Sequence, residues 1–134
     1  MNRTNALKQE ATKQGKPSNF LIFNPTNINY FANFSGANAL LIPEKGENIL
    51  YVSGVNYEQA KKEAKGLTVD LLNRGENLME KIARQSPSQK FSVDALPIES
   101  WRALAKAVGG EEKLELANNL LRDQKKSKMK KKSS

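Results

Sequence analysis

The sequence predicts one α/β domain: a mixed sheet of about five strands with helices on both faces. Short apolar runs alternate with segments whose apolar residues recur at helical spacing, and this alternation is typical of layered α/β domains. A glycine-containing loop at residues 43–48 joins two of the apolar runs and predicts an antiparallel hairpin. The length of 134 residues suits a single core.

The strands are expected where the chain is apolar over three to five residues. Phe20–Phe23 is continuously apolar, as in a strand covered on both faces, whereas Leu67–Leu71 alternates between apolar and polar residues. The five expected strands are at residues 20–23, 39–42, 49–52, 67–71 and 91–93.

The helices are expected where breakers and caps bound an apolar stripe. The first covers residues 4–14, and a later one starts at Asn56, with Gln59 as the capping-box partner. Pro97 precedes another helix. The apolar faces of the last three expected helices are Leu78, Met79, Ile82 and Ala83; then Trp101, Leu104, Ala105 and Val108; and finally Leu114, Ala117, Leu120 and Leu121.

The composition excludes several kinds of chemistry. The chain has no cysteine and no histidine, so it offers no thiolate, no imidazole base and no nitrogen or sulfur ligand for a metal. The acidic residues show no spacing that predicts a shared metal site, and no glycine-rich loop precedes a helix carrying a phosphate-binding lysine. We expect no catalytic, cofactor-binding or metal-binding residue in this chain.

The apolar runs are too short for a signal peptide or a membrane span. We therefore expect a cytoplasmic location and no membrane partner.

The net charge of +8 is concentrated at the C-terminus. Residues 122–134 contain seven basic residues and one acidic residue, which gives +6 and leaves about +2 for the first 121 residues. We therefore predict a domain at residues 1–121, followed by a basic tail or inter-domain linker at 122–134. The basic residues of this segment are Arg122, Lys125, Lys126, Lys128, Lys130, Lys131 and Lys132.

Three segments, taken in order, resemble the N-terminal domain of the creatinase/prolidase family. Residues 27–34, NINYFANF, resemble that family's N-I-x-Y-L-x-G-F segment. Residues 50–60, LYVSGVNYEQA, are similar to its strand followed by R-Y-x-x-Q-A, and Leu120-Leu121-Arg122 with the lysines that follow is similar to its L-R-x-x-K linker. Pro97 to Leu104 lies where the family has a proline and an aromatic-bearing helix, so the resemblance covers residues 3 to 128.

Two positions depart from the family pattern. Asn33 stands where the family usually has glycine, and Asn56 stands where it usually has arginine. The second change removes a cation that could reach toward a substrate carboxylate, which puts a substrate-facing role for this part of the chain in doubt.

The resemblance implies a non-catalytic domain. In full-length relatives such a domain precedes a pita-bread catalytic domain that binds two metal ions through Asp, His and Glu, and this second domain is absent here. The implied role is that of the N-terminal domain of a metal-dependent Xaa-Pro peptidase, with dimerisation and shaping of the substrate entrance as its work. Its partners would be a catalytic metallopeptidase domain, a second copy of the chain, or both.

The residues that carry the resemblance also have plainer structural interpretations. Asn27 is expected to be a cap or turn residue. Tyr30 and Phe34, with Phe31, are expected to pack at the edge of the sheet rather than to bind a ligand. Tyr57 is expected at the start of a helix with its ring in the core.

Trp101 and the lysine-rich tail each leave alternatives open. Trp101 is either a core anchor or part of an apolar patch where a partner docks. The tail is a solvated linker, a phosphate-contacting segment for nucleic acid or another polyanion, or a nuclear-targeting signal. The tail lacks aromatic residues, which argues against specific binding of single strands. The alternative function is thus that of a stand-alone binding module whose tail contacts a polyanion.

Overall fold

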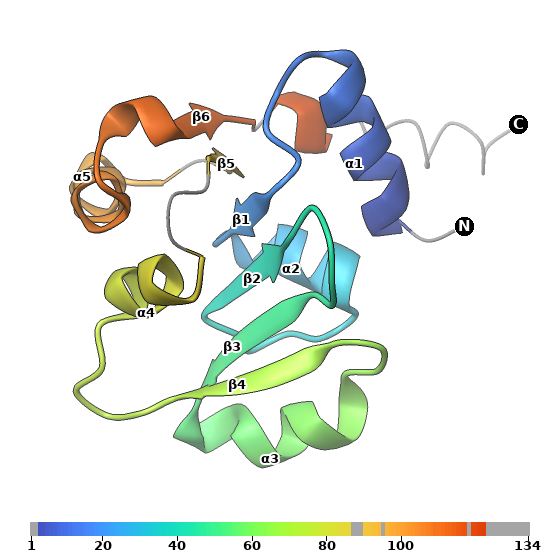
Figure 1. Ribbon diagram of the computed structural model, residues 1–134. Helices are drawn as coiled ribbons and strands as arrows, with labels where there is room; N and C mark the ends of the chain where they lie inside the picture. Colours follow the sequence, from blue (N-terminus) through green and yellow to red (C-terminus); the bar gives the residue numbers. More distant parts are fainter. Residues whose placement is uncertain (1–2, 87–89, 95, 118, 123–134) are drawn as a thin grey trace, which may run out of the picture.

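A computed structural model describes residues 3–86, 90–94, 96–117 and 119–122, and these form a mixed α/β domain. Its sheet has six strands in the order β4-β3-β2-β1-β5-β6 (Figure 1). The predicted mixed sheet is confirmed, with one strand more than expected. The strands are β1 Phe20–Ile22, β2 Ala39–Ile42, β3 Ile49–Ser53, β4 Thr68–Leu72, β5 Phe91–Val93 and β6 Leu114–Leu116.

Helices connect most of these strands and lie on both faces of the sheet. They are α1 Arg3–Lys13, α2 Pro25–Ala32, α3 Gly54–Glu63, α4 Leu78–Gln85 and α5 Ile98–Val108. A short 3-10 helix, η1 Glu111–Lys113, precedes β6.

The strand directions give the sheet two distinct ends. The predicted hairpin is confirmed, because β2 runs antiparallel to both β1 and β3, with Leu40 opposite Leu50. The other pairs, β1–β5, β5–β6 and β3–β4, are parallel. Five of the six strands therefore end at one edge of the sheet, which we call the carboxyl edge.

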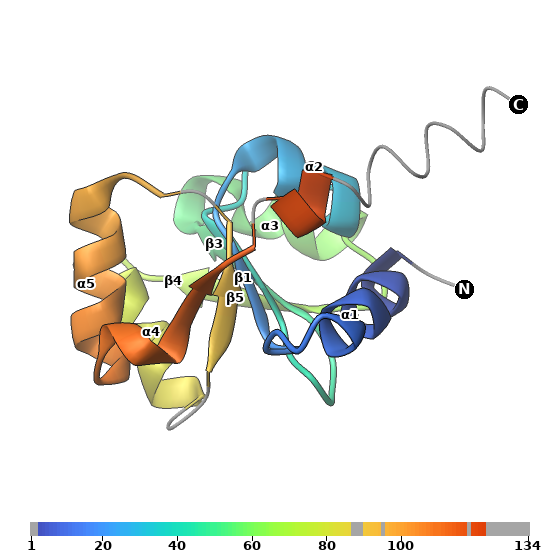
Figure 2. The same ribbon diagram turned by 90° about the horizontal axis from the view of Figure 1, so that it is seen from above.

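The apolar side chains of the strands divide between two cores. In β1, Phe20 and Ile22 belong to the first core, whereas Leu21 belongs to the second. This alternation follows from the two-residue period of a strand and from the presence of helices on both faces. The first core includes Leu7 of α1 and Ile28 of α2, and the second includes residues of α4 and α5. Figure 2 shows α1 and α2 on one side of the sheet and α4 and α5 on the other.

The final predicted helix is wrong. Residues 114–116 form β6, which pairs in parallel with β5 and places Leu114 opposite Phe91, while residues 119–122 are helical. Leu114 belongs to the second core, whereas Ala117, Leu120 and Leu121 belong to the first. The helical spacing of these four residues thus reflects a chain that crosses from one face of the sheet to the other.

Within the part of the chain that the structure describes, no helix is long and apolar enough to cross a membrane.

Candidate functional site

Two of the three family-like segments meet at one corner of the carboxyl edge. The loop after α2, residues 33–38, lies against the start of α3, residues 53–56. The Asn56 side-chain amide donates to the Gly36 carbonyl at 2.9 Å, and the Ser53 backbone N–H donates to Asn38 Oδ1 at 3.0 Å. We call these two segments the α2–α3 corner.

Asn56 does not cap α3, and that prediction is wrong. The helix begins two residues earlier, at Gly54, and its N-cap residue is Ser53, whose side chain makes no capping hydrogen bond. The Asn56 amide is used instead to hold the loop after α2. The Asn56 side chain lies close to the Gly36 backbone. A Cβ atom at residue 36 would lie 3.1 Å from Asn56 Nδ2, which is closer than ordinary van der Waals contact.

Asn33 occupies a backbone conformation that explains the glycine usual in the family. Its φ of 56° and ψ of 39° are left-handed, and its N–H donates to the Asn29 carbonyl as it ends α2. Glycine adopts this conformation without strain, and asparagine is the side chain that replaces it most readily. The departure at residue 33 therefore preserves the helix end.

Asn27 is not the cap of α2; Asn24 is. Asn24 Oδ1 accepts from the Thr26 backbone N–H at 2.9 Å, as an N-cap residue does. Asn27 lies one turn into the helix and is buried, and its amide donates to Asp94 Oδ2 at 3.3 Å. The sequence analysis expected a cap or turn residue at Asn27, whereas the capping residue is Asn24, three positions earlier.

Asp94 is a fully buried carboxylate that the sequence analysis missed. It follows β5 and accepts backbone N–H bonds from Phe23 at 2.9 Å and Asn24 at 2.8 Å, in addition to the Asn27 amide. Burial raises the pKa of Asp94, and the hydrogen bonds from Asn24, Phe23 and Asn27 oppose that shift. An acidic residue directly after a buried strand was the available signal.

The aromatic residues of the family-like segments differ in how they pack. Phe34 is buried in the first core. Tyr30 is half-buried, stacks edge-to-face on Phe31 with 4.8 Å between ring centroids, and lies under the Arg3 guanidinium at 4.1 Å. Tyr57 lies near the start of α3 and is half-buried, with the Lys61 ammonium 5.3 Å from its ring centroid. It is not among the described residues of either core, so the expected core packing of its ring is not seen.

The other predicted site residues do not join this corner. Trp101 is half-buried and packs against the second core, which favours the core-anchor interpretation. Arg122 is exposed at the end of the described chain. The predicted tail contacts fall outside the described residues; they are Lys125, Lys126, Lys128, Lys130, Lys131 and Lys132.

A polar network that the sequence analysis also missed links α4 to strands β3 and β4. Lys81 is buried, donates to the Leu71 carbonyl at 2.8 Å, and pairs with Asp70 at 3.1 Å and Glu76 at 3.2 Å. Burial alone would lower the pKa of Lys81, but its bonds to Asp70 and Glu76 raise it overall. The Gln85 side chain donates to Asp70 and accepts from the Tyr51 hydroxyl.

Burial and the nearby Asp70 charge raise the pKa of Tyr51, so its hydroxyl stays protonated as a donor. The groups of this network therefore satisfy one another.

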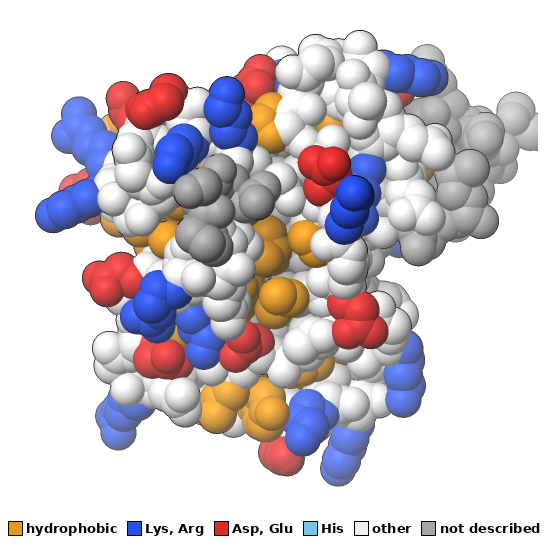
Figure 3. All heavy atoms as spheres, in the orientation of Figure 1, with side chains coloured by type: hydrophobic (Ala, Val, Ile, Leu, Met, Phe, Trp, Pro, Cys, Tyr) orange, Lys and Arg blue, Asp and Glu red, His pale blue; other side chains and the backbone are white. Residues whose placement is uncertain are grey.

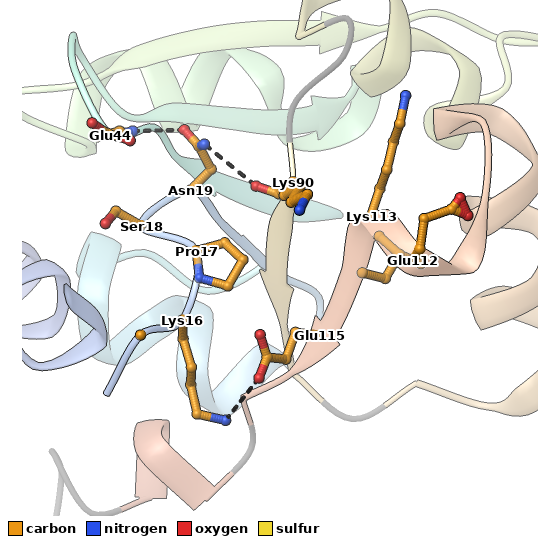
Figure 4. A pocket seen from close by; sticks show the side chains of 11 residues that line it. Lys16, Pro17, Ser18, Asn19, Glu44, Lys90, Glu112, Lys113 and Glu115 are labelled. Carbon is orange, nitrogen blue, oxygen red and sulfur yellow. Dashed lines mark hydrogen bonds and ion pairs between the residues drawn. The ribbon is translucent and has the colours of Figure 1, made fainter. Parts of the chain in front are cut away.

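A cavity lies at the opposite end of the sheet. It measures about 610 Å³ and is lined by residues at the starts of β1, β5 and β6 (Figure 4). Lys16 crosses it to pair with Glu115 at 3.6 Å, and Asn19 accepts from the Glu44 backbone N–H at 2.7 Å. The cavity is lined by three lysines and three glutamates, so its charges balance, and none of the sequence-predicted site residues lines it.

The described residues do not provide a metal centre. Over the ranges given above, no group of three or more His, Cys, Asp or Glu side chains could hold an ion. The face seen in Figure 3 carries Lys and Arg side chains interspersed with Asp and Glu, with hydrophobic side chains in its central hollow. The protein is thus a small α/β domain in which asparagine side chains hold together the α2–α3 corner of the carboxyl edge.

The family follows from the sequence match. Residues 3–124 match the family described as Creatinase/Prolidase N-terminal domain, and the chain belongs to this family. The expected resemblance is therefore confirmed over nearly the whole chain. No curated protein matches the chain in sequence.

Solved structures share the fold. A proline dipeptidase from Streptococcus pneumoniae TIGR4 superimposes with a TM-score of 0.78 at 16% identity, over 93% of this chain and 98% of that one. The Xaa-Pro dipeptidase from Bacillus anthracis gives 0.75 at 22% identity, over 89% of this chain and 34% of that one.

The prolidase from Pyrococcus horikoshii OT3 gives a TM-score of 0.74 at 21% identity, over 90% of this chain and 34% of that one. The chain thus spans the whole of the pneumococcal structure but about a third of the other two.

Proposed function

We propose that this chain serves as the non-catalytic N-terminal domain of a metal-dependent Xaa-Pro peptidase, in which it dimerises and helps to shape the substrate entrance. The observation that carries the proposal is the family match over residues 3–124. Solved structures of dipeptidases and of a prolidase share the fold, and two of them are about three times as long as this domain. In such a protein the catalytic work belongs to the part outside this domain.

The residues of this chain do not fit the two-metal centre expected in the catalytic domain of relatives. The sequence has no histidine, and the described acidic side chains form no cluster of three. The chain would therefore contribute surfaces and shape, with no step of hydrolysis assigned to its own residues.

The α2–α3 corner supports a role at the substrate entrance. It lies at the carboxyl edge, where loops from several strands converge and where α/β sheets commonly bind ligands. Its exposed polar groups are neutral amides and a hydroxyl. They can form hydrogen bonds to a peptide backbone but cannot form an ion pair with a substrate carboxylate.

A peptidase assay tests the absence of catalysis in this chain. The purified chain, incubated with an Xaa-Pro dipeptide and Mn²⁺ or Co²⁺, is expected to show no release of proline above the protein-free control. Metal-stimulated turnover that copurifies with the chain would contradict the proposal.

A second candidate function rests on the distribution of charge. Of the net charge of +8, residues 122–134 supply +6. This concentration favours a stand-alone module whose tail contacts a polyanion through sequence-independent phosphate contacts. Such binding is expected to collapse between low and moderate salt and to disappear when residues 123–134 are removed; binding that survives both treatments would contradict this candidate.

A further inference from the structure

Another cavity, of about 460 Å³, lies where the start of α1 meets the ends of α2 and α3. Figure 1 shows these three helix ends on the same side of the molecule. We call it the three-helix cavity. Part of its lining directly precedes β3 and β4, so it lies toward the amino ends of these strands. Of the described residues that line it, only Asn33 also belongs to the α2–α3 corner. Its volume is typical of small-molecule sites.

The three-helix cavity is positively charged. Arg3 and Lys65 line it, and no Asp or Glu is among the described residues of its lining. Glu47 and Glu63 are close in sequence to lining residues, but each carboxylate accepts a side-chain hydrogen bond at 2.6 Å from a residue outside the lining. A hollow lined by one sign of charge concentrates ions of the opposite sign. The lining therefore favours an anion.

Both cations can bind an anion without giving up an ion pair. Arg3 Nη1 donates to the Tyr30 carbonyl at 2.6 Å, and its guanidinium carbon lies 4.1 Å from the centroid of the Tyr30 ring. A guanidinium has five N–H donors in a rigid plane, so this anchoring orients Arg3 and leaves donors for a ligand. Lys65 is exposed and makes no hydrogen bond or ion pair with the part of the chain that the structure describes.

The cavity also has an apolar wall. Tyr30, Phe31 and Leu67 line it and are half-buried, and the last two pack against the first core. We call these three side chains the aromatic wall. Aromatic side chains bind flat rings by stacking and by edge contacts. Asn33 and Asn48 also line the cavity, and their amides can donate to or accept from the polar edge of such a ring.

We propose that the three-helix cavity binds an organic phosphate that carries a flat ring. The phosphate lies between Arg3 and Lys65, and the ring lies against the aromatic wall. A phosphate monoester carries a charge of about −1.5 to −2 at pH 7, which two cations match, and an arginine guanidinium can donate to two phosphate oxygens at once. This site goes beyond the proposed function and does not rest on it, because it uses residues to which no peptidase role is assigned.

A nuclear magnetic resonance titration of the full ¹⁵N-labelled chain with adenosine 5′-monophosphate (AMP) tests the site. Salt at about 0.15 M screens weak contacts of exposed charges elsewhere on the chain. AMP is expected to shift the backbone amide signals of Asn33, Lys65 and Gly66. It is expected to bind at least about tenfold more tightly than adenosine or inorganic phosphate, because only AMP contacts both the cations and the aromatic wall.

A matched pair of variants separates the site from general attraction by a basic chain. Lys65→Gln removes one cation of the cavity and is expected to raise the dissociation constant for AMP by about tenfold. Lys106→Gln removes the same charge at an exposed position of α5, on the other side of the sheet, and is expected to change it by less than about twofold. The spectra also show whether each variant remains folded.

AMP binding that is no tighter than binding of inorganic phosphate would overturn the proposal, and so would equal weakening by the two variants. Shifts confined to residues 123–134 would assign the phosphate to the basic tail and would also overturn it. Each of these failures leaves the peptidase-domain role standing, since that role is tested by the peptidase assay.

Discussion

Asn33 shows how one backbone angle decides which residues a position accepts. Its left-handed conformation ends α2 and turns the chain into the loop that meets α3. The family's usual glycine and this chain's asparagine are two solutions to the same requirement, because both tolerate a positive φ. The α2–α3 corner is therefore retained although the residue has changed.

Substitution at residue 33 is expected to separate backbone strain from side-chain contacts. Asn33→Ala should lower the free energy of unfolding by about 1 kcal/mol, since alanine is strained in the left-handed region. Asn33→Gly should stay within about 0.5 kcal/mol of the wild type. Urea unfolding measures both, and an alanine variant as stable as the glycine variant would contradict the role given to φ.

Asp94, directly after β5, accepts hydrogen bonds from three donors in the segment between β1 and α2 and in α2 itself. The donors are the backbone N–H groups of Phe23 and Asn24 and the side-chain amide of Asn27. Because burial raises the pKa of Asp94, the native state binds the proton more tightly than the unfolded chain does. The stability that this group contributes is therefore present below the ordinary aspartate pKa of about 3.9 and is lost as the pH rises through the raised native value.

The Asp94→Asn variant, which cannot titrate, exposes this pH dependence. The free energy of unfolding of the wild type minus that of Asp94→Asn should fall as the pH rises from about 4 toward 7, by at most about 1.4 kcal/mol per pH unit. Urea titrations at successive pH values give this difference. A difference that rises with pH would mean that the three donors lower the pKa more than burial raises it.

At the scale of elements, Lys81 links α4 to β4, the strand at one edge of the sheet, by a hydrogen bond and an ion pair. Its ammonium bonds to the Leu71 carbonyl on edge strand β4 and to the carboxylates of Asp70 and Glu76. A cation held against an edge strand also occupies a carbonyl that another strand could otherwise pair with. The network thus serves both packing and protection of the edge.

Removal of this cation is expected to destabilise the fold. Lys81→Ala should lower the free energy of unfolding by about 2 kcal/mol, because Asp70 and the Leu71 carbonyl lose a partner in a largely buried place. Lys106→Ala, at an exposed position of α5, is the control and should change it by less than about 0.5 kcal/mol. Equal stability of the two variants would show that the Lys81 network contributes nothing.

The sequence was sufficient for elements that are defined by their own residues. The apolar runs of β1, β2 and β3 and the glycine-containing loop of the hairpin can be recognised locally, and the structure confirms them. The sequence was insufficient where contacts between residues far apart in the chain determine the secondary structure. β6 became a strand because β5 offers it a parallel partner, although Leu114 and Leu121 fit a helical period.

The buried polar groups were missed for the same reason. Asn27 caps nothing and instead meets Asp94, 67 positions away, and Asn56 meets Gly36 rather than its own helix. Such partners are set by how the strands are ordered, which spacing along the chain does not reveal.

At the scale of the whole molecule, folding and charge are predicted to reside in different parts of the chain. Residues 1–121 carry about +2 and include the core residues that the structure describes, whereas residues 122–134 carry +6. The boundary at 121/122 stays a prediction from composition.

Deletion of residues 123–134 tests that boundary. The free energy of unfolding is expected to change by less than about 0.5 kcal/mol, since the composition of this segment predicts a solvated tail outside the folded domain. Urea unfolding of the full and shortened chains gives the comparison. A larger loss would show that the removed segment is part of the folded domain.

The size of the native gene product tests the central claim most directly. An antibody raised against this domain, used on an extract of the source cells, is expected to detect a protein several times 14.9 kDa that copurifies with Xaa-Pro peptidase activity. That result would place the catalytic residues outside this domain of a longer enzyme. A product of 14.9 kDa without such activity would contradict the claim and leave a stand-alone binding protein.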